Sequence, residues 1–274
     1  MVRPARVRMT RAWWRSWPLV LVAILLALAA LAPLLAPFAP DAVNLAERRL
    51  PPTATHWFGT DELGRDVLTR VWYGARVSLA VGVLSALLAS ALGAVIGGVG
   101  GYRRGWLDSL LMRLTDAMLA IPRLPLLMIA AAILQPSIPL LIVLVGVVGW
   151  METARVVRAD VLSLAQRPFV EAARATGARD LRIVPMHILP NAAPAMAVST
   201  TLAVGRGILL ESALSFFGVG VQPPAASWGN MLYQAQTTMT TEPWMALFPG
   251  AMIFLAVFSI NVLGDRLAHG TRTS

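Results

Sequence analysis

One uncharged stretch, residues 77–99, most constrains what this chain can fold into. It reads VSLAVGVLSALLASALGAVIGGV, and serine is its only polar residue type. It exceeds the ~20 residues that span ~30 Å of hydrocarbon as a helix, and it lacks the polar stripe of a surface helix in a soluble domain. The composition agrees, since 57% of the residues are hydrophobic and only 14% are charged. We therefore predict an all-α integral membrane protein.

Five further apolar stretches bring the expected number of transmembrane helices to about six. The first follows an arginine-rich start and resembles a signal peptide, but no soluble mature domain follows it, which favours an uncleaved span. Residues 138–150 are too short alone, so their helix is expected to continue through Glu152, Arg155 and Arg158. The five stretches are residues 17–38, 114–134 (interrupted by Pro122 and Pro125), 138 onward, 192–217 and 244–264.

The arginines predict how these spans are oriented. With a cytoplasmic N-terminus, both tails, the turn at residues 103–104 and the loop at residues 168–190 place arginine inside, as the positive-inside rule requires. The loops at residues 135–139 and 218–243 then lie outside and carry Glu242 as their only charge. Both termini are thus expected in the cytoplasm. One outside segment, residues 41–76, is an exception with several arginines: Arg48, Arg49, Arg65, Arg70 and Arg76.

Two residue types are missing, and their absence excludes several kinds of site. Without cysteine there are no disulfides or thiolate ligands, and without lysine there is no Walker A loop or Schiff base. The net charge of +9 comes from arginines that flank apolar stretches, so membrane lipid, and not nucleic acid, is the expected partner. His56, His187 and His269 are far apart in sequence, so we expect no metal site or cofactor in this chain.

Small residues recur every four positions around the 77–99 stretch. Such rows allow the backbones of neighbouring membrane helices to approach closely. The first row is Ser90, Ala94 and Gly98, and the second is Gly93, Gly97 and Gly101.

The loop at residues 168–190 is polar and charged, although it separates two apolar stretches. Alanines favour a helix over residues 169–181, Pro168 suits its first turn, and Gly177 is expected to bend or end it. Such a helix could lie on lipid headgroups or dock into a groove of a partner protein.

This loop resembles the EAA loop of permease subunits of bacterial ABC importers. The similarity rests on EAARATG at residues 171–177 and on Leu189 and Pro190, with one departure, since His187 stands where the pattern prefers an apolar residue. The resemblance implies a coupling helix that docks on an ATP-hydrolysing subunit. The residues that match the motif, and are implied to take part in coupling, are Glu171, Ala172, Ala173, Gly177, Leu189 and Pro190.

Three further motifs are similar to the second (C-type) permease of dipeptide, oligopeptide and nickel importers. They are HWFGTDELGRDVLTRVWYGARVSL at residues 56–79, ALSFFGVGVQPPAASWGNML at 213–232 and NVLGD at 261–265. The resemblance implies a type I permease fold in the bacterial inner membrane, paired with a homologous permease, two ATP-binding subunits that hold ATP and Mg, and an extracytoplasmic substrate-binding protein. The chain itself would be non-catalytic. Short peptides are the expected cargo, and nickel or a nickel chelate is the alternative.

These features divide the chain into three parts. Residues 1–75 would comprise the tail, the first transmembrane helix and an extracytoplasmic loop. Residues 76–265 would form a permease core of five transmembrane helices that includes the 168–190 loop, and residues 266–274 a cytoplasmic tail.

Ionisable residues inside the spans are candidates for a role in transport. Arg206 and Glu211 fall within the fifth span, where charges are costly and usually face protein or water. They could line the pathway, bind a peptide terminus or join subunits, although a spacing of five does not place them on one helical face. Arg123 is expected to extend to the membrane interface. Glu171 could contact the partner subunit or interact with its own helix dipole.

A cluster of charges before the second span allows two interpretations. Asp61, Glu62, Arg65 and Asp66 could ligate a cation, but the arginine in their midst favours an internal salt-bridged structure. The family resemblance places this cluster on the extracytoplasmic side, near the binding protein. Trp228 is expected to be an interfacial anchor that could also touch the binding protein.

Two other classes of membrane protein fit the sequence less well. An intramembrane aspartyl protease would need glycine two residues before Gly264 in the Gly264–Asp265 pair, and Val262 stands there. An ion channel would be expected to show a filter-like sequence or a ring of acidic residues, and the 168–190 loop would have no purpose in it.

Overall fold

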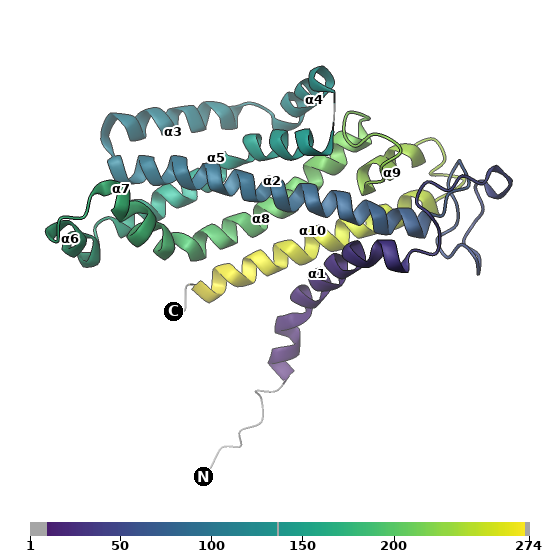
Figure 1. Ribbon diagram of the computed structural model, residues 1–274, viewed down its shortest axis with the longest axis horizontal. Helices are drawn as coiled ribbons and strands as arrows, with labels where there is room; N and C mark the ends of the chain where they lie inside the picture. Colours follow the sequence, from purple (N-terminus) through teal and green to yellow (C-terminus); the bar gives the residue numbers. More distant parts are fainter. Residues whose placement is uncertain (1–9, 136, 272–274) are drawn as a thin grey trace, which may run out of the picture.

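The chain folds into a bundle of long helices in a computed structural model that describes residues 10–135 and 137–271 (Figure 1). Apart from one bridge between Thr60 and Asp66, the regular structure of these residues is helical, which confirms the predicted all-α class. The elements are α1 (Thr10–Leu35), η1 (Leu45–Glu47), α2 (Val67–Arg103), α3 (Gly105–Ala120), α4 (Arg123–Leu134), α5 (Ile138–Leu164), α6 (Pro168–Ala175), α7 (Asp180–Ile183), the π-helical η2 (Val184–Ile188), α8 (Leu189–Phe216), α9 (Trp228–Ala235) and α10 (Trp244–Thr271).

Five helices within the described residues are long and apolar enough to cross a membrane, namely α1, α2, α5, α8 together with η2, and α10. The pair α3 and α4 makes a sixth span if it is counted as one, so the expected number is confirmed. This third span is not the single segment at residues 114–134 that the sequence predicts. Its halves meet at 83°, because Pro122 keeps the preceding Ile121 in an extended conformation, with φ −80° and ψ 126°.

The second span begins earlier than its apolar stretch. Asp66 caps α2, since its carboxylate accepts a hydrogen bond from the Thr69 N–H at 2.8 Å. Arg70 and Arg76 therefore belong to a helix and not to the preceding loop. The charged continuation of α5 to Leu164 is confirmed. Other boundaries differ by a few residues: α1 ends at Leu35, α8 begins at Leu189 and α10 continues to Thr271.

The two rows of small residues on α2 meet different helices, as expected of close packing. On one row, a Cβ added at Gly93 or Gly97 would collide with backbone atoms of α5, so glycine is required for this approach. On the other row, Ser90 accepts a hydrogen bond from Thr200 of α8 at 2.7 Å. The predicted packing role of both rows is confirmed, and α2 lies between α5 and α8.

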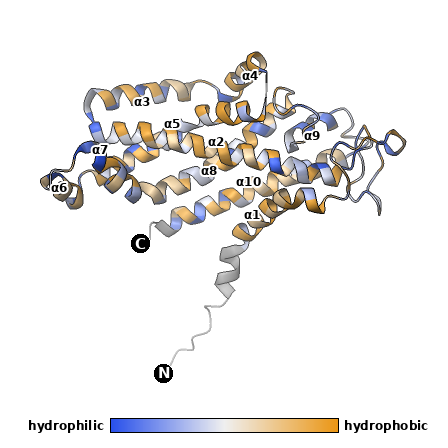
Figure 2. Cartoon of the chain, in the orientation of Figure 1, coloured by the Kyte–Doolittle hydropathy of each residue, from blue (hydrophilic) through white to orange (hydrophobic). Residues whose placement is uncertain are grey.

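The outside of the bundle is also apolar. Large side chains remain exposed along several helices, and in Figure 2 hydrophobic colour runs along the bundle, while hydrophilic colour gathers in the segments at its two ends. An exposed apolar surface of this extent marks a region that lipid or another subunit covers. Examples are Leu84, Leu87, Val95, Ile129 and Phe254.

Candidate functional site

The 168–190 segment lies at one end of the bundle, where α6 and α7 project from the long helices (Figure 1). Pro168 occupies the first turn of α6, where its missing N–H costs nothing. The helix ends in a Schellman motif: the Ala178 N–H bonds to the Ala173 carbonyl at 3.1 Å and the Gly177 N–H to the Arg174 carbonyl at 2.9 Å. Gly177 has φ 82°, which glycine adopts without strain. The predicted helix over residues 169–181 is therefore two helices, with the break where Gly177 was expected to bend the chain.

One face of α6 is anchored and the other is open. Val170 is fully buried in a cluster with residues of α2, α5, α7 and η2, and Ala173 packs against this cluster. Glu171, Ala172 and Gly177 are exposed on the other side. Three of the implied coupling residues, Glu171, Ala172 and Gly177, are thus accessible to a partner. Of the remaining two, Leu189 is half-buried and Pro190 is exposed, and both open α8.

The 168–190 segment is tied to the bundle in two ways. First, the Tyr102 hydroxyl of α2 donates a hydrogen bond to Asp180 of α7 at 2.6 Å, and the Arg174 guanidinium stands 5.4 Å from the centre of the Tyr102 ring. Hydrogen bonding to Tyr102 is the main cause of a raised pKa at Arg174. Second, α7, η2 and α8 follow one another without a gap. A displacement of the segment would therefore reach α2 and α8 directly.

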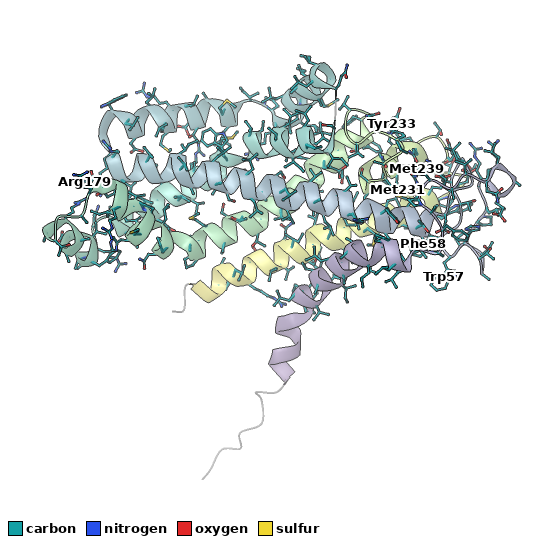
Figure 3. The ribbon with its side chains drawn as sticks, viewed as in Figure 1. Trp57, Phe58, Arg179, Met231, Tyr233 and Met239 are labelled. Atoms are coloured by element: carbon teal, nitrogen blue, oxygen red, sulfur yellow. The ribbon has the colours of Figure 1, made fainter. Side chains whose placement is uncertain are left out.

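The opposite end of the bundle carries the α1–α2 loop, residues 36–66 (Figures 1 and 3). Asp61 pairs there with Arg65 at 2.7 Å and with Arg70 at 3.5 Å, and all three side chains are buried. Asp66 contacts the buried His56 ring at 2.9 Å. The salt-bridged interpretation of this cluster is confirmed. Arg65 and Arg70 therefore share one carboxylate inside the protein.

The remaining acid of the cluster behaves differently from its neighbours. The side chain of Glu62 is 38% exposed, and among the described residues it pairs with Arg49, at 3.5 Å. Of the expected binding-protein contacts, it is therefore the one whose side chain is accessible. Within the described residues, no group of three or more potential metal ligands occurs.

Trp228 and Glu211 lie inside the subunit, although the sequence suggested surface roles for both. The Trp228 indole donates to the Val71 carbonyl at 3.0 Å, and its backbone N–H donates to Ser78 at 3.2 Å. The Glu211 carboxylate accepts hydrogen bonds from Ser78 and from Ser215, both at 2.8 Å. Neither side chain has any exposed surface in this structure, so their visible role is to join α2, α8 and α9.

Arg206 pairs with a residue that the sequence did not single out as its partner. Glu152 of α5 accepts from Arg206 of α8 at 2.7 Å and from Arg123 of α4 at 2.9 Å. Arg123 was expected to extend to the membrane interface, and the structure shows that its guanidinium is paired with Glu152 of α5. Helical periodicity could not reveal this triad, since its members come from three separate helices.

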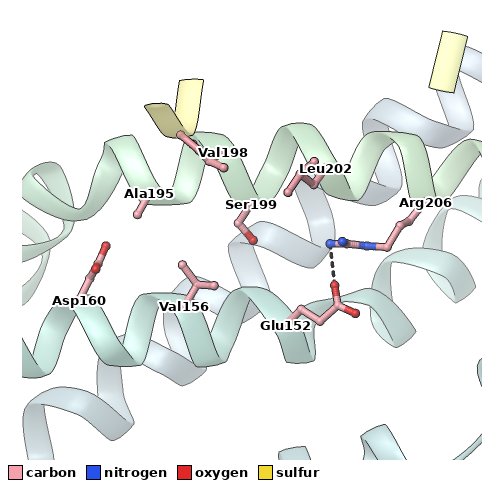
Figure 4. A pocket seen from close by; sticks show the side chains of 9 residues that line it. Glu152, Val156, Asp160, Ala195, Val198, Ser199, Leu202 and Arg206 are labelled. Carbon is pink, nitrogen blue, oxygen red and sulfur yellow. Dashed lines mark ion pairs between the residues drawn. The ribbon is translucent and has the colours of Figure 1, made fainter. Parts of the chain in front are cut away.

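The Arg206–Glu152 pair stands at one end of a cavity of about 410 Å³ between α5 and α8 (Figure 4). Asp160 of α5 lies near the other end, and Val156, Ser199 and Leu202 line the space between. Charged side chains at membrane depth normally face protein or water, which agrees with this position.

Comparisons with known proteins agree with this arrangement. Residues 89–273 match the family described as binding-protein-dependent transport system inner membrane component. The dipeptide transport system permease protein DppC of Bacillus subtilis is 42% identical over 250 residues, which cover 91% of this chain and 78% of that protein. The oligopeptide transport system permease protein OppC of the same organism is 36% identical over 249 residues, which cover 91% of this chain and 82% of that protein.

A solved structure supports the fold. The inward-facing MetNI methionine ABC transporter contains a chain with a TM-score of 0.59 and 20% identity, and the match covers 74% of this chain and 95% of that one. The apolar helices, the exposed 168–190 segment and the family match lead to one conclusion. This chain belongs to the inner membrane components of binding-protein-dependent transport systems, the multi-pass permease subunits of ABC importers.

Proposed function

We propose that this chain forms, with a homologous second permease, the membrane pathway of an ATP-driven importer of short peptides. Two relatives are named as dipeptide and oligopeptide permeases, which favours peptide over nickel as the cargo. Two partner subunits would bind and hydrolyse ATP with Mg, and an extracytoplasmic binding protein would deliver the peptide.

The observation that carries this proposal is the construction of α6. Its inner face is fixed by Val170 in the core, its outer face exposes Glu171, and its segment continues through α7 and η2 into α8. A partner subunit that moves α6 would therefore move α8 as well. ATP need only bind the inward-open and outward-open states with different affinity to drive the exchange between them.

The two ends of the bundle would face opposite sides of the membrane. The 168–190 segment and both termini would lie in the cytoplasm, beside the ATP-binding subunits. The α1–α2 loop lies at the far end in Figure 1 and would face the binding protein. Arg49 and the partly exposed Glu62 are among its accessible charges for such a contact.

The test is ATP-dependent uptake by vesicles that contain the whole complex. Labelled dipeptides and oligopeptides would be compared with nickel, using wild type, Glu171→Ala and Glu171→Gln. We expect peptide uptake, and at least a tenfold loss in Glu171→Ala while the ATP-binding subunits still copurify. The control is Asp116→Ala, an exposed carboxylate of α3 outside the 168–190 segment, which should keep its uptake. Nickel uptake without peptide uptake would refute the proposed cargo.

A further inference from the structure

The cavity between α5 and α8 has an unequal distribution of charge. At one end a single carboxylate, Glu152, is shared by two guanidinium groups, those of Arg123 and Arg206. The side chains of Glu152 and Arg206 are both 37% exposed, so the pair is open to the cavity. One positive charge remains there without a matching carboxylate, and an anionic group would complete it.

The other end carries the opposite charge. Asp160 lines the cavity and points into the space between the helices in Figure 4. Its carboxylate makes no ion pair or side-chain hydrogen bond with any residue that the structure describes. An unpaired carboxylate on a membrane-spanning helix is costly, and a cationic group in the cavity would relieve that cost.

The two ends are separated by a defined length. Glu152 and Asp160 lie on the same face of α5, eight residues apart, which is about 12 Å along a helix that rises 1.5 Å per residue. An extended peptide spans roughly 3.3–3.6 Å per residue. The separation therefore corresponds to a peptide of about three to four residues, whose termini carry the complementary charges.

The wall between the ends suits such a chain. Val156, Val198 and Leu202 give apolar contact without defining a particular side-chain pocket, and Ser199 adds a hydroxyl. Arg206 also lines, with Arg123, a second cavity of only about 20 Å³. This second cavity is too small for a peptide.

Resting on the proposed peptide import, we propose that this cavity is a contact site for extended peptides of about three to four residues. Arg206 would bind the terminal carboxylate and Asp160 the terminal ammonium. Glu152 would hold the Arg206 guanidinium in the empty site and share it when the peptide arrives. A dipeptide would reach only one of the two ends.

The experiment uses the absence of cysteine from this chain. Leu202→Cys places one thiol in the cavity of the complete complex in vesicles, and Ser163→Cys places one on the exposed end of α5, outside the cavity. A membrane-impermeant maleimide labels each thiol during ATP-driven uptake, with a tetrapeptide, a dipeptide or no peptide. We expect the tetrapeptide to slow labelling at position 202 about fivefold and to leave position 163 unchanged. Val198→Cys serves if Leu202→Cys fails to assemble.

Charge variants then test the two ends. Arg206→Gln removes the charged hydrogen-bond donor to the terminal carboxylate of the peptide. It should therefore raise the tetrapeptide concentration needed for protection about tenfold or more. Asp160→Asn should do so for the tetrapeptide and not for the dipeptide. The matched controls are Arg155→Gln and Asp116→Asn, an ion pair between α5 and α3 that does not line this cavity, and both should leave protection unchanged.

The outcomes separate the two proposals. A wild-type complex that imports no peptide would refute the proposed function, and this inference with it. Peptide uptake without protection of position 202 would overturn the inference alone. Protection that Arg206→Gln and Asp160→Asn leave unchanged, or equal effects of Asp160→Asn on both peptides, would overturn the recognition of the termini.

Discussion

The α1–α2 loop and the 168–190 segment are both polar stretches between apolar spans, but they treat their charges in opposite ways. In the loop, Asp61 pairs with Arg65 and with Arg70 of the first turn of α2, and all three side chains are buried. In the segment, Glu171 and Arg179 are exposed at the end of the bundle (Figure 3). Sequence composition alone does not distinguish these two arrangements.

The difference indicates what each region contributes. Buried and paired charges are strongly destabilising when one partner is removed, so they tie the loop to the stability of the subunit. Exposed charges contribute little to folding and remain available to a partner. We therefore expect substitutions in the loop to change the free energy of unfolding, and substitutions in the segment to change uptake.

The largest effect is expected for Asp61→Ala. This change leaves the guanidinium groups of Arg65 and Arg70 buried without their carboxylate, which should lower the free energy of unfolding by about 3–5 kcal/mol. The measurement is denaturant unfolding of the purified subunit in detergent. Glu62→Ala is the control, since its exposed ion pair should contribute less than about 1 kcal/mol. Equal losses of unfolding free energy in the two variants would contradict the contrast between buried and exposed ion pairs.

Two glycines provide a second contrast, because both have positive φ. Gly64 in the loop has φ 72°, and an added Cβ would collide with the Asn44 carbonyl. Gly177 in the segment has φ 82°, and an added Cβ would meet no atom within 4 Å. Gly64→Ala should therefore cost about 3 kcal/mol from strain and overpacking, and Gly177→Ala about 1 kcal/mol from strain alone. Unfolding in detergent measures both, and a larger cost at position 177 would contradict the contrast.

Much of the fold could be predicted from the sequence, because membrane helices carry a strong local signal. The length of residues 77–99, the small residues on α2 and the interruption at Pro122 all reflect local physics. The 83° bend between α3 and α4 could not be predicted in size, since proline fixes the conformation of its neighbour but not the packing of the two halves. The start of α2 was missed because the polar residues after the Asp66 cap are outside the apolar run.

The candidate sites also divide into residues that a local motif reveals and residues that only tertiary packing brings together. The coupling motif is contiguous, so a resemblance could identify Glu171 and Gly177. The Arg123–Glu152–Arg206 triad comes from α4, α5 and α8, and only tertiary packing brings it together. Similarly, nothing local shows that Trp228 and Glu211 are enclosed in the subunit. Long-range pairing is the part of a site that sequence periodicity does not contain.

Two phenylalanines, one in each region, extend the comparison of the α1–α2 loop and the 168–190 segment to apolar side chains. Phe169 of α6 is 40% exposed, whereas Phe58 of the loop stacks on Phe248 with ring centres 3.7 Å apart. Phe169→Ala should lower the affinity for the ATP-binding subunits about tenfold and change unfolding by less than about 0.5 kcal/mol. Phe58→Ala should instead lower the free energy of unfolding and leave the affinity for the ATP-binding subunits unchanged. Copurification titrations and detergent unfolding measure the two quantities, and a destabilised Phe169→Ala subunit would count against an open docking face.

The smallest expected effect concerns the link between the 168–190 segment and α2. Tyr102→Phe removes the hydroxyl that donates to Asp180 at 2.6 Å and keeps the ring beneath Arg174. A single hydrogen bond contributes about 1 kcal/mol, so global unfolding should change little.

If this bond transmits movement of the segment to α2, peptide uptake should nevertheless fall about two- to fivefold, since 1 kcal/mol is a factor of about five. Tyr233→Phe is the matched control, because Tyr233 is an exposed tyrosine on α9 near the other end of the bundle. Equal uptake in Tyr102→Phe and wild type, with a loss in Tyr102→Ala, would assign the link to the ring and Arg174. A loss in Tyr102→Phe at unchanged assembly would show that even the open segment depends on one buried attachment, and would narrow the contrast between the two regions.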